Sequence, residues 1–262
     1  MYDLSSLREK RAFISDMDGV VYRGKEMVPG TDKFIAWLER EGKDYLFLTN
    51  ASALGPSELS DRLYRLGLKV GKEHFYTSAM ATAAFINDQM QGASAYVVGA
   101  EGLVRTLTEA GVKLTDENPD YVIVGATPSF DFGMIAKASI LIRRGARFIG
   151  TNRDFTYPTE TGEAMPACAS LVASIEAASG ISAYYVGKPN PYIMRKALDY
   201  MKVRAEDAVM IGDTVETDIR VGVESGLDTV FVLSGTDSLE TLKSYAYQPR
   251  YILSSLGDIA SE

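Results

Sequence analysis

Short runs of apolar residues alternate with longer segments of mixed character along most of this chain. The short runs are rich in Val, Ile, Phe and Tyr, and most are followed by Gly, Asn or Asp, which is typical of buried strands. The segments between them repeat apolar residues at intervals of three and four, which predicts amphipathic helices. The expected strands are Ala12–Asp16, Tyr45–Thr49, Phe75–Thr77, Ala95–Val98, Tyr121–Val124, Arg147–Gly150, Ala183–Val186, Ala208–Ile211, Thr229–Leu233 and Tyr251–Leu253.

Strands that alternate with helices predict an α/β fold with parallel sheets. So many strands exceed the usual width of one open sheet, and we therefore expect two sheets. The segment 88–183 has a strand–helix alternation of its own and begins after the polar break NDQMQGAS. We therefore expect a second α/β domain at 88–183, inserted into a parallel-sheet core domain that consists of 1–87 and 184–262.

The overall charge limits the classes of partner. The chain has 262 residues, of which 46% are hydrophobic and 24% charged, and its net charge is −8. This composition is that of a globular protein, and the negative charge argues against a nucleic acid or an anionic membrane as partner. An anionic substrate must therefore be held by local groups rather than by the overall field.

Cysteine and histidine are each present once, as Cys168 and His74. A single cysteine cannot form an intramolecular disulfide, and this pair excludes zinc sites made of several Cys and His ligands. We expect Cys168, at the start of an amphipathic helix, to pack rather than react.

The first residues, MYDLSSLREKR, lack the apolar core of a signal peptide, and no run reaches membrane-spanning length. We expect a soluble, cytoplasmic protein.

Polar residues whose side chains can bind a ligand or take part in a reaction follow four of the predicted strands. Because the carboxyl ends of parallel strands share one edge of a sheet, these residues are expected to meet there. Any one of them alone could be a helix cap or a solvated surface group, but the set predicts a site. Its carboxylates suit Mg²⁺, and its lysine, hydroxyl and amide groups suit a phosphate. The residues are Asp16, Asp18, Thr49, Asn50, Lys188 and Asp213.

The stretches that contain these residues resemble the four motifs of the haloacid dehalogenase (HAD) superfamily of phosphatases. They are DMDGV, the strand end LFLTN, the lysine in VGKPNP, and GDTVETD, in that order. The segments FYTSAMATA, GARFIGTN and YYVGKPNPYI resemble the NagD-like, 4-nitrophenylphosphatase-like branch, which has a large inserted cap of type C2. The resemblance covers nearly the whole chain and implies a Rossmann-like core with an α/β cap.

The resemblance implies a role for each acid of the motifs. Asp16 resembles the nucleophile that becomes an aspartyl-phosphate, and Asp18 resembles the general acid and base. The carboxylates of Asp16 and Asp213 and the backbone carbonyl of Asp18 resemble the protein ligands of a Mg²⁺ cofactor. Asp218 resembles the second acid of the fourth motif, which orients Lys188 or a metal-bound water.

The phosphate-binding groups follow from the same resemblance. Thr49 and Asn50 look like the second motif, and Lys188 looks like the lysine that neutralises the phosphoryl group. Gly19 allows the tight reversal that aims neighbouring N–H groups at phosphate. Related sequences often have another Asn after Asn50, whereas this chain has Ala51.

A long connection, residues 151–167, interrupts the expected cap domain, and long loops in compact domains are often functional. The resemblance implies that this loop faces the core site and contacts the leaving group. Arg153, Asp154, Tyr157 and Glu160 are the candidates, and aromatic stacking on a ring and acid contacts to sugar hydroxyls both stay open.

The predicted function is a Mg²⁺-dependent phosphatase of small phosphate monoesters, such as nucleoside monophosphates, sugar phosphates or 4-nitrophenyl phosphate. A phosphotransferase or mutase of the same superfamily would use the same residues. A signalling receiver domain also accepts phosphate on Asp, but it normally lacks an acid at the position of Asp18 and has no large insert. A noncatalytic phosphometabolite sensor would not need a general acid. Monomer and homodimer both stay open.

Overall fold

The computed structural model describes residues 3–158 and 163–260, and the chain divides into two compact units. The first unit contains Met1–Thr49, Ser60–Tyr76 and Met194–Glu262, and the second contains Asn50–Leu59 and Thr77–Ile193. Each unit has its own main sheet, which confirms the prediction of two sheets. The domain limits predicted at 88 and 183 stay predictions.

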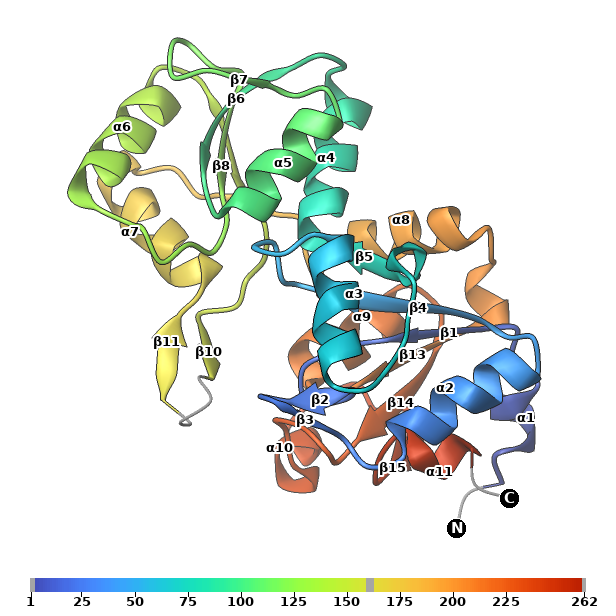
Figure 1. Ribbon diagram of the computed structural model, residues 1–262. Helices are drawn as coiled ribbons and strands as arrows, with labels where there is room; N and C mark the ends of the chain where they lie inside the picture. The colour runs from blue at the N-terminus through green and yellow to red at the C-terminus, as the bar shows by residue number, and fades with distance from the viewer. Residues whose placement is uncertain (1–2, 159–162, 261–262) are drawn as a thin grey trace. The chain divides into compact units, whose positions relative to one another are not determined.

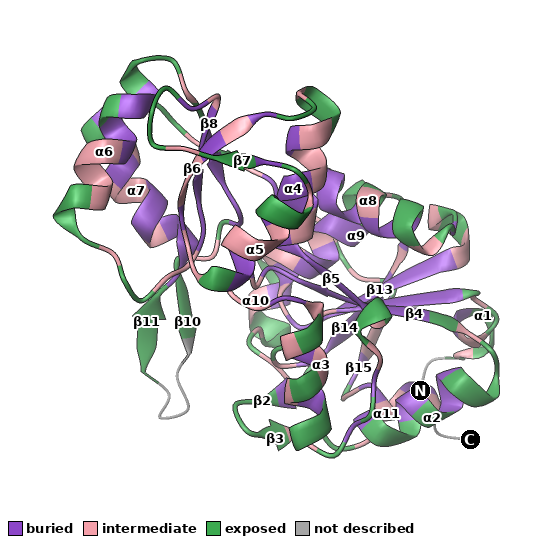
Figure 2. Cartoon of the chain, turned by 45° about the horizontal axis from the view of Figure 1, so that its top comes forward, coloured by how far each residue is buried: buried purple, intermediate pink, exposed green. Residues whose placement is uncertain are grey.

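The main sheet of the first unit has six strands (Figure 1). Parallel pairing joins β1 to β13 and β4, and continues from β13 through β14 to β15. The strands of this sheet are buried along most of their length, as Figure 2 shows for β13 and β14. In spatial order they are β15 (Tyr251–Leu253), β14 (Asp228–Val232), β13 (Ala208–Gly212), β1 (Ala12–Ser15), β4 (Asp44–Thr49) and β5 (Phe75–Thr77).

Helices and short turns connect these strands. A hairpin of β2 (Tyr22–Arg23) and β3 (Glu26–Met27) follows β1. Two helices, α3 (Pro56–Arg65) and α8 (Pro191–Met201), each contain a limit between the units. The other helical elements of this unit are α1 (Ser5–Arg8), α2 (Thr31–Arg40), η1 (Lys72–His74), η2 (Ala205–Asp207), the π-helical turn η3 (Val215–Ile219), α9 (Arg220–Glu224), α10 (Leu239–Lys243) and α11 (Gly257–Ala260).

Apolar side chains fill both faces of the six-stranded sheet. On one face, α2 packs Phe34 and Trp37 edge-on against Phe13 of β1, with ring centroids 5.9 and 5.4 Å apart. Another cluster joins Phe231 of β14 to Val215 and other buried residues around η3. Burial on both faces explains why these strands read as continuous apolar runs.

The second unit has a five-stranded sheet in the order β12–β9–β8–β6–β7. Figure 1 shows α6 and α7 on one side of this sheet and α4 and α5 on the other. Residues of α6 and α7 form one buried cluster with β6, β8 and β9. The elements are α4 (Ser78–Gln89), β6 (Ser94–Val98), α5 (Glu101–Glu109), β7 (Lys113–Leu114), β8 (Tyr121–Val124), α6 (Phe132–Arg143), β9 (Arg147–Gly150), β10 (Thr156–Pro158), β11 (Ala164–Pro166), α7 (Cys168–Ser179) and β12 (Tyr184–Tyr185).

Every strand predicted from an apolar run is present, with ends within two residues of the prediction. The short strands β2, β3, β7, β10 and β11 were not predicted from the sequence. Both residues of β7 are exposed and the described part of the β10–β11 hairpin is largely exposed, so neither produces a buried apolar run.

Cys168 is fully buried at the start of α7, as expected of a packing residue. None of the helices in the described ranges has both the length and the apolar composition needed to cross a membrane.

Candidate functional site

The order of strands in the first unit determines where its acids lie. From β1 the chain adds β4 and β5 on one side of the sheet, and it later returns to place β13 on the other side. The β1–β13 pair is therefore the point at which the direction of winding changes, and open α/β sheets bind ligands beyond the carboxyl ends of such a pair. Asp16 directly follows β1 and donates its backbone N–H to Ile211 O at 2.9 Å, while Asp213 directly follows β13.

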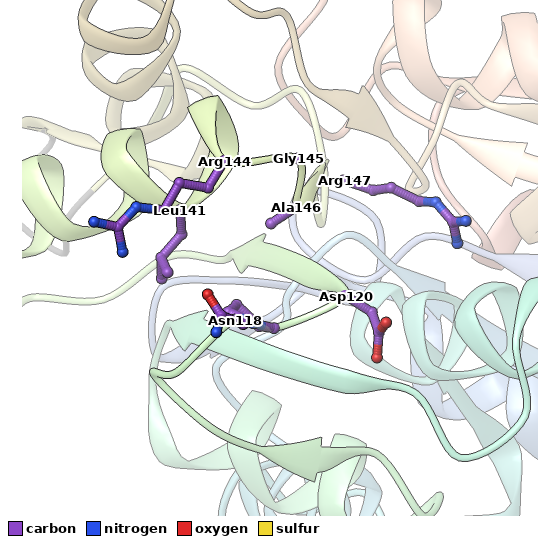
Figure 3. A pocket seen from close by; sticks show the side chains of 8 residues that line it. Asn118, Asp120, Leu141, Arg144, Gly145, Ala146 and Arg147 are labelled. Carbon is purple, nitrogen blue, oxygen red and sulfur yellow. The ribbon is translucent and has the colours of Figure 1, made fainter.

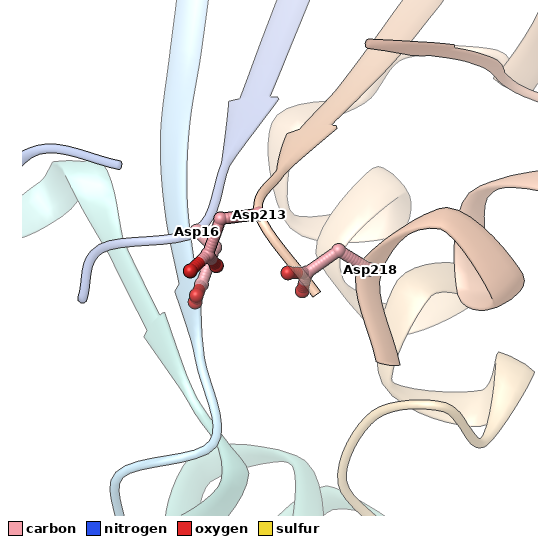
Figure 4. A group of neighbouring side chains, drawn as sticks. All are labelled: Asp16, Asp213 and Asp218. Carbon is pink, nitrogen blue, oxygen red and sulfur yellow. The ribbon is translucent and has the colours of Figure 1, made fainter. Parts of the chain in front are cut away.

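Three carboxylates gather at this edge of the sheet. One carboxylate oxygen from each of Asp16, Asp213 and Asp218 lies within 4.8 Å of the others, and Asp213 and Asp218 are almost fully buried. Figure 4 shows the Asp218 carboxylate directed toward those of Asp16 and Asp213. Grouped carboxylates repel one another when ionised, and a hard cation with oxygen ligands removes that repulsion. The donor set fits Mg²⁺, which favours a few carboxylates and retained water.

Backbone groups hold the buried acids of this cluster. Thr236 donates its N–H to Asp213 Oδ2 at 2.6 Å, and Thr214 donates its N–H to Asp218 Oδ2 at 3.2 Å. Gly212, the last residue of β13, leaves room for Asp218, because a Cβ at Gly212 would lie 2.1 Å from Asp218 Cβ. Charge-assisted hydrogen bonds to backbone N–H groups fix the direction in which each carboxylate points.

Asp18 differs from the other acids because it is exposed. Its Oδ2 accepts a hydrogen bond of 3.1 Å from the hydroxyl of Tyr22, a fully buried residue. Burial and, after it, the negative charge of Asp18 raise the pKa of Tyr22, so the phenol stays protonated and can keep donating at neutral pH. An exposed carboxylate that accepts this hydrogen bond can exchange protons with a reactant or with water.

Gly19 makes the reversal that follows Asp18. Its φ is +79°, its N–H donates to Tyr22 O at 2.8 Å, and its carbonyl accepts from Ser234 Oγ at 2.8 Å. A Cβ at this position would lie 2.3 Å from Asp213 Oδ2, so glycine is required both for the backbone angle and for the space. This turn therefore brings the chain directly against the acidic cluster.

The predicted phosphate-binding residues of the second unit also gather. Asn50 Oδ1 accepts the Lys188 N–H at 2.8 Å, and Asn50 Nδ2 donates to Lys188 O and to Asp154 Oδ1, each at 3.1 Å. Asn50 and Lys188 are 8% and 2% exposed. Thr49, the residue before Asn50, ends β4 in the first unit and is also buried. The structure thus brings together one group of predicted residues in each unit.

The sequence did not predict two side chains that contact the backbone of Asn50. Asn152 Nδ2 and Ser78 Oγ donate to the backbone carbonyl of Asn50 at 2.8 and 2.6 Å, and both residues are buried. A signal for Asn152 was present, because β9 ends in the sequence Thr-Asn just as β4 does. The rule that polar residues beyond strand ends form sites applies to Asn152 as it does to Asn50.

Among the described loop candidates, Arg153 and Tyr157 take no part in this hydrogen-bond network. Arg153 is exposed, and its guanidinium carbon lies 5.6 Å from the centroid of the Tyr185 ring. Tyr157, on β10, is 48% exposed. Glu160 lies outside the described residues.

A pocket of about 210 Å³ opens elsewhere in the second unit, where Asp120 precedes β8 and Arg147 begins β9. Figure 3 shows the guanidinium groups of Arg144 and Arg147 directed away from each other. Asp120 accepts hydrogen bonds from the hydroxyl and N–H of Ser94, which hold its pKa below the ordinary value. The charged groups around this pocket therefore diverge or serve the fold, and the pocket lies at the amino ends of these strands.

Two family models match this chain, and known proteins match it over nearly its whole length. The family model described as haloacid dehalogenase-like hydrolase matches residues 13–113, and one described as HAD-hydrolase-like matches residues 185–259. Dihydroxyacetone phosphatase of Corynebacterium glutamicum is 43% identical over 95% of this chain and 90% of its own length. Ribonucleotide monophosphatase NagD of Escherichia coli is 42% identical over 94% of this chain and 96% of its own.

Two solved structures of phosphatases are also similar to this chain. The NagD structure superposes with a TM-score of 0.90 at 40% identity, covering 95% of this chain and 98% of that one. A 4-nitrophenylphosphatase from Thermotoga maritima superposes with a TM-score of 0.92 at 30% identity, covering 97% of both chains.

Proposed function

The chain belongs to the haloacid dehalogenase-like hydrolases and is a phosphoric monoester hydrolase, and we propose that it hydrolyses small phosphate monoesters through a covalent phosphate on Asp16. The cluster of Asp16, Asp213 and Asp218 at the carboxyl edge of the sheet supports this proposal most strongly. The individual roles are proposed from the resemblance of the chain's four motifs to those of the superfamily.

In the first half of the reaction, a carboxylate oxygen of Asp16 attacks phosphorus, and the bond from phosphorus to the leaving oxygen breaks. Asp18 donates a proton to that oxygen. In the second half, Asp18 takes a proton from water, the water oxygen attacks phosphorus, the bond from phosphorus to the Asp16 oxygen breaks, and inorganic phosphate is released. The exposure of Asp18 and its hydrogen bond from Tyr22 suit this double role.

Asp16, Asp213 and the backbone carbonyl of Asp18 would hold Mg²⁺. When bound, the ion neutralises negative charge and so lets one anion approach another. Asp218, which points toward Asp16 and Asp213 in Figure 4, would orient Lys188 or a water next to the ion. Thr49 hydroxyl and backbone N–H groups after Gly19 would bind the phosphoryl oxygens.

In the second unit, Lys188 completes the proposed phosphate-binding set, and the Asn50 side chain is hydrogen-bonded to the Lys188 backbone. Lys188 supplies a positive charge for the phosphoryl oxygens, which a chain of net charge −8 cannot supply through its overall field. Arg153 and Tyr157, both exposed on the loop after β9, are proposed contacts for the leaving group.

The substrate is proposed as a small phosphorylated metabolite. The two named relatives are a dihydroxyacetone phosphatase and a ribonucleotide monophosphatase, so their substrates differ in size and in the groups that they offer for recognition. A panel of three-carbon, sugar and nucleoside monophosphates would rank these classes by kcat/KM.

The test is the release of 4-nitrophenol and phosphate from 4-nitrophenyl phosphate with Mg²⁺, with EDTA, and with the variant Asp16→Asn. We expect turnover that requires the metal and disappears in the variant. Turnover that survives in Asp16→Asn would refute the assigned nucleophile. Phosphate transferred to an added alcohol or sugar, rather than released to water, would favour the phosphotransferase alternative.

A further inference from the structure

The hydrogen bonds of Asn50 indicate a role for Asn50 and Asp154 that the four superfamily motifs do not indicate. The carboxamide of Asn50 has two N–H hydrogens, and two acceptors lie at hydrogen-bond distance from Nδ2: Lys188 O and Asp154 Oδ1. Asn50 Oδ1 faces the Lys188 N–H. Exchanging the amide oxygen and nitrogen would place oxygen against two acceptors, so only one orientation satisfies all three partners.

Both side-chain hydrogens of Asn50 are therefore committed within the protein. Two of the three hydrogen bonds of its side chain go to the backbone of Lys188, one to its N–H and one to its carbonyl. Such a double contact restrains the peptide groups on both sides of Lys188 Cα. Asn50 thus determines where the lysine side chain begins, rather than offering its amide to phosphate.

Asp154 is placed to hold Asn50 in that orientation. Its own backbone is fixed on both sides, because its N–H donates to Asn152 Oδ1 at 3.1 Å and its carbonyl accepts from Ala169 N at 2.9 Å. Asn152 in turn donates to Asn50 O at 2.8 Å. Asp154 is half-buried at the start of the long loop, so a single chain of hydrogen bonds links the loop to Lys188.

We propose that Asp154 is a positioning residue for phosphate binding, which acts on Lys188 through Asn50, and not a contact for the leaving group. This proposal rests on the proposed function, in which Lys188 binds the phosphoryl group. It predicts that the loss of Asp154 affects every substrate alike, because the phosphoryl group is common to all of them. A contact with the leaving group would instead matter only for substrates that offer it a hydroxyl.

The experiment compares Asp154→Ala, Asp154→Asn, Lys188→Ala and the double variant of Asp154→Ala with Lys188→Ala. Activity is measured as kcat/KM on 4-nitrophenyl phosphate and on ribose 5-phosphate. The dissociation constant of inorganic phosphate is measured by calorimetry with Mg²⁺ present. Asp116→Ala is the matched control, because this exposed acid of the same unit pairs only at the surface with Lys137.

We expect Asp154→Ala to lower kcat/KM by about 10–100-fold on both substrates and to weaken phosphate binding. Asp154→Asn keeps an oxygen acceptor for Asn50 Nδ2 and should recover activity to within about threefold of the wild type. In the Lys188→Ala background, the loss of Asp154 should change kcat/KM by less than about twofold, since its effect passes through that lysine. The control should stay within about twofold.

A loss confined to ribose 5-phosphate would overturn the proposal in favour of a leaving-group contact. Losses that multiply in the double variant would show that Asp154 acts independently of Lys188. Unchanged or tighter phosphate binding by Asp154→Ala would refute it as well, because removal of a negative charge alone favours an anion. If Asp154→Ala does not fold, Asp154→Ser replaces it, since a serine hydroxyl is too short to reach Asn50. If the wild type hydrolyses neither ester, the proposed function fails, while phosphate binding still decides the role of Asp154.

Discussion

The substitution Gly19→Ala tests whether the turn after Asp18 and the acidic cluster are packed against each other. The new methyl group would lie 2.3 Å from Asp213 Oδ2 and 2.9 Å from the Cα of Gly235, and the backbone angle φ of +79° would stay positive. Gly24→Ala is a matched control, because Gly24 also has a positive φ, of +57°, but no atom lies within 4 Å of its added Cβ.

The two substitutions therefore share one cost and differ in another. An alanine with positive φ loses about 1–2 kcal/mol, which applies to both. At Gly19 the Asp213 carboxylate must also move away from the Thr236 N–H, now 2.6 Å from its Oδ2. Losing this hydrogen bond to a charged group costs about 1.5–3 kcal/mol more. The expected loss in free energy of unfolding is about 2.5–5 kcal/mol for Gly19→Ala and about 1–2 kcal/mol for Gly24→Ala.

The fluorescence of Trp37 can measure the difference in free energy of unfolding in the first unit, which contains both glycines. Trp37 is the single tryptophan, it is 6% exposed, and it lies on α2 in the first unit. Urea unfolding followed by its fluorescence, in EDTA so that no metal adds stability, reports on this unit. Because Asp213 is a proposed ligand, Gly19→Ala should also raise the Mg²⁺ concentration for half-maximal activity by about 10–100-fold. Equal stability losses in the two variants, together with an unchanged Mg²⁺ requirement in Gly19→Ala, would refute the reasoning.

Three further predictions concern single groups of the site and its surroundings. Asp213→Asn removes a charge from the cluster and should raise the Mg²⁺ concentration for half-maximal activity by more than about tenfold; a magnesium titration that matches the wild type would contradict its role as ligand. Tyr22→Phe removes the hydroxyl that donates to Asp18 Oδ2 and should lower kcat by about 3–30-fold with little change in KM, which steady-state kinetics would check. Burial raises the pKa of the Cys168 thiol, and thiolate is the reactive form, so the native protein at pH 8 should react with Ellman's reagent more than about tenfold slower than protein unfolded in guanidinium. Equal rates in the two states would mean that the thiol is accessible.

The sequence by itself determined the strands that are buried on both sides. Runs such as Tyr121–Val124 and Ala208–Gly212 consist of apolar residues because each strand is covered on two faces, and this burial is visible in the order of residues. It also determined which side chains end those strands. The prediction that Asp16 and Asp213 meet followed from the parallel sheet, since all carboxyl ends of parallel strands lie at one edge.

Only the tertiary structure decided the short strands and the hydrogen-bond partners. The two residues of β7 and the described part of the β10–β11 hairpin are largely exposed and so form no buried apolar run, and their pairing depends on neighbours supplied by other parts of the chain. The proposed role of Asp154 also depends on the tertiary structure. In the sequence it was one of several polar loop residues, and its hydrogen bond with Asn50 depends on how β9, α7 and the segment after β4 are packed. A hydrogen bond requires a donor–acceptor distance within a few tenths of an ångström and a favourable angle. Residue order alone determines neither for residues as far apart in the chain as Asn50 and Asp154.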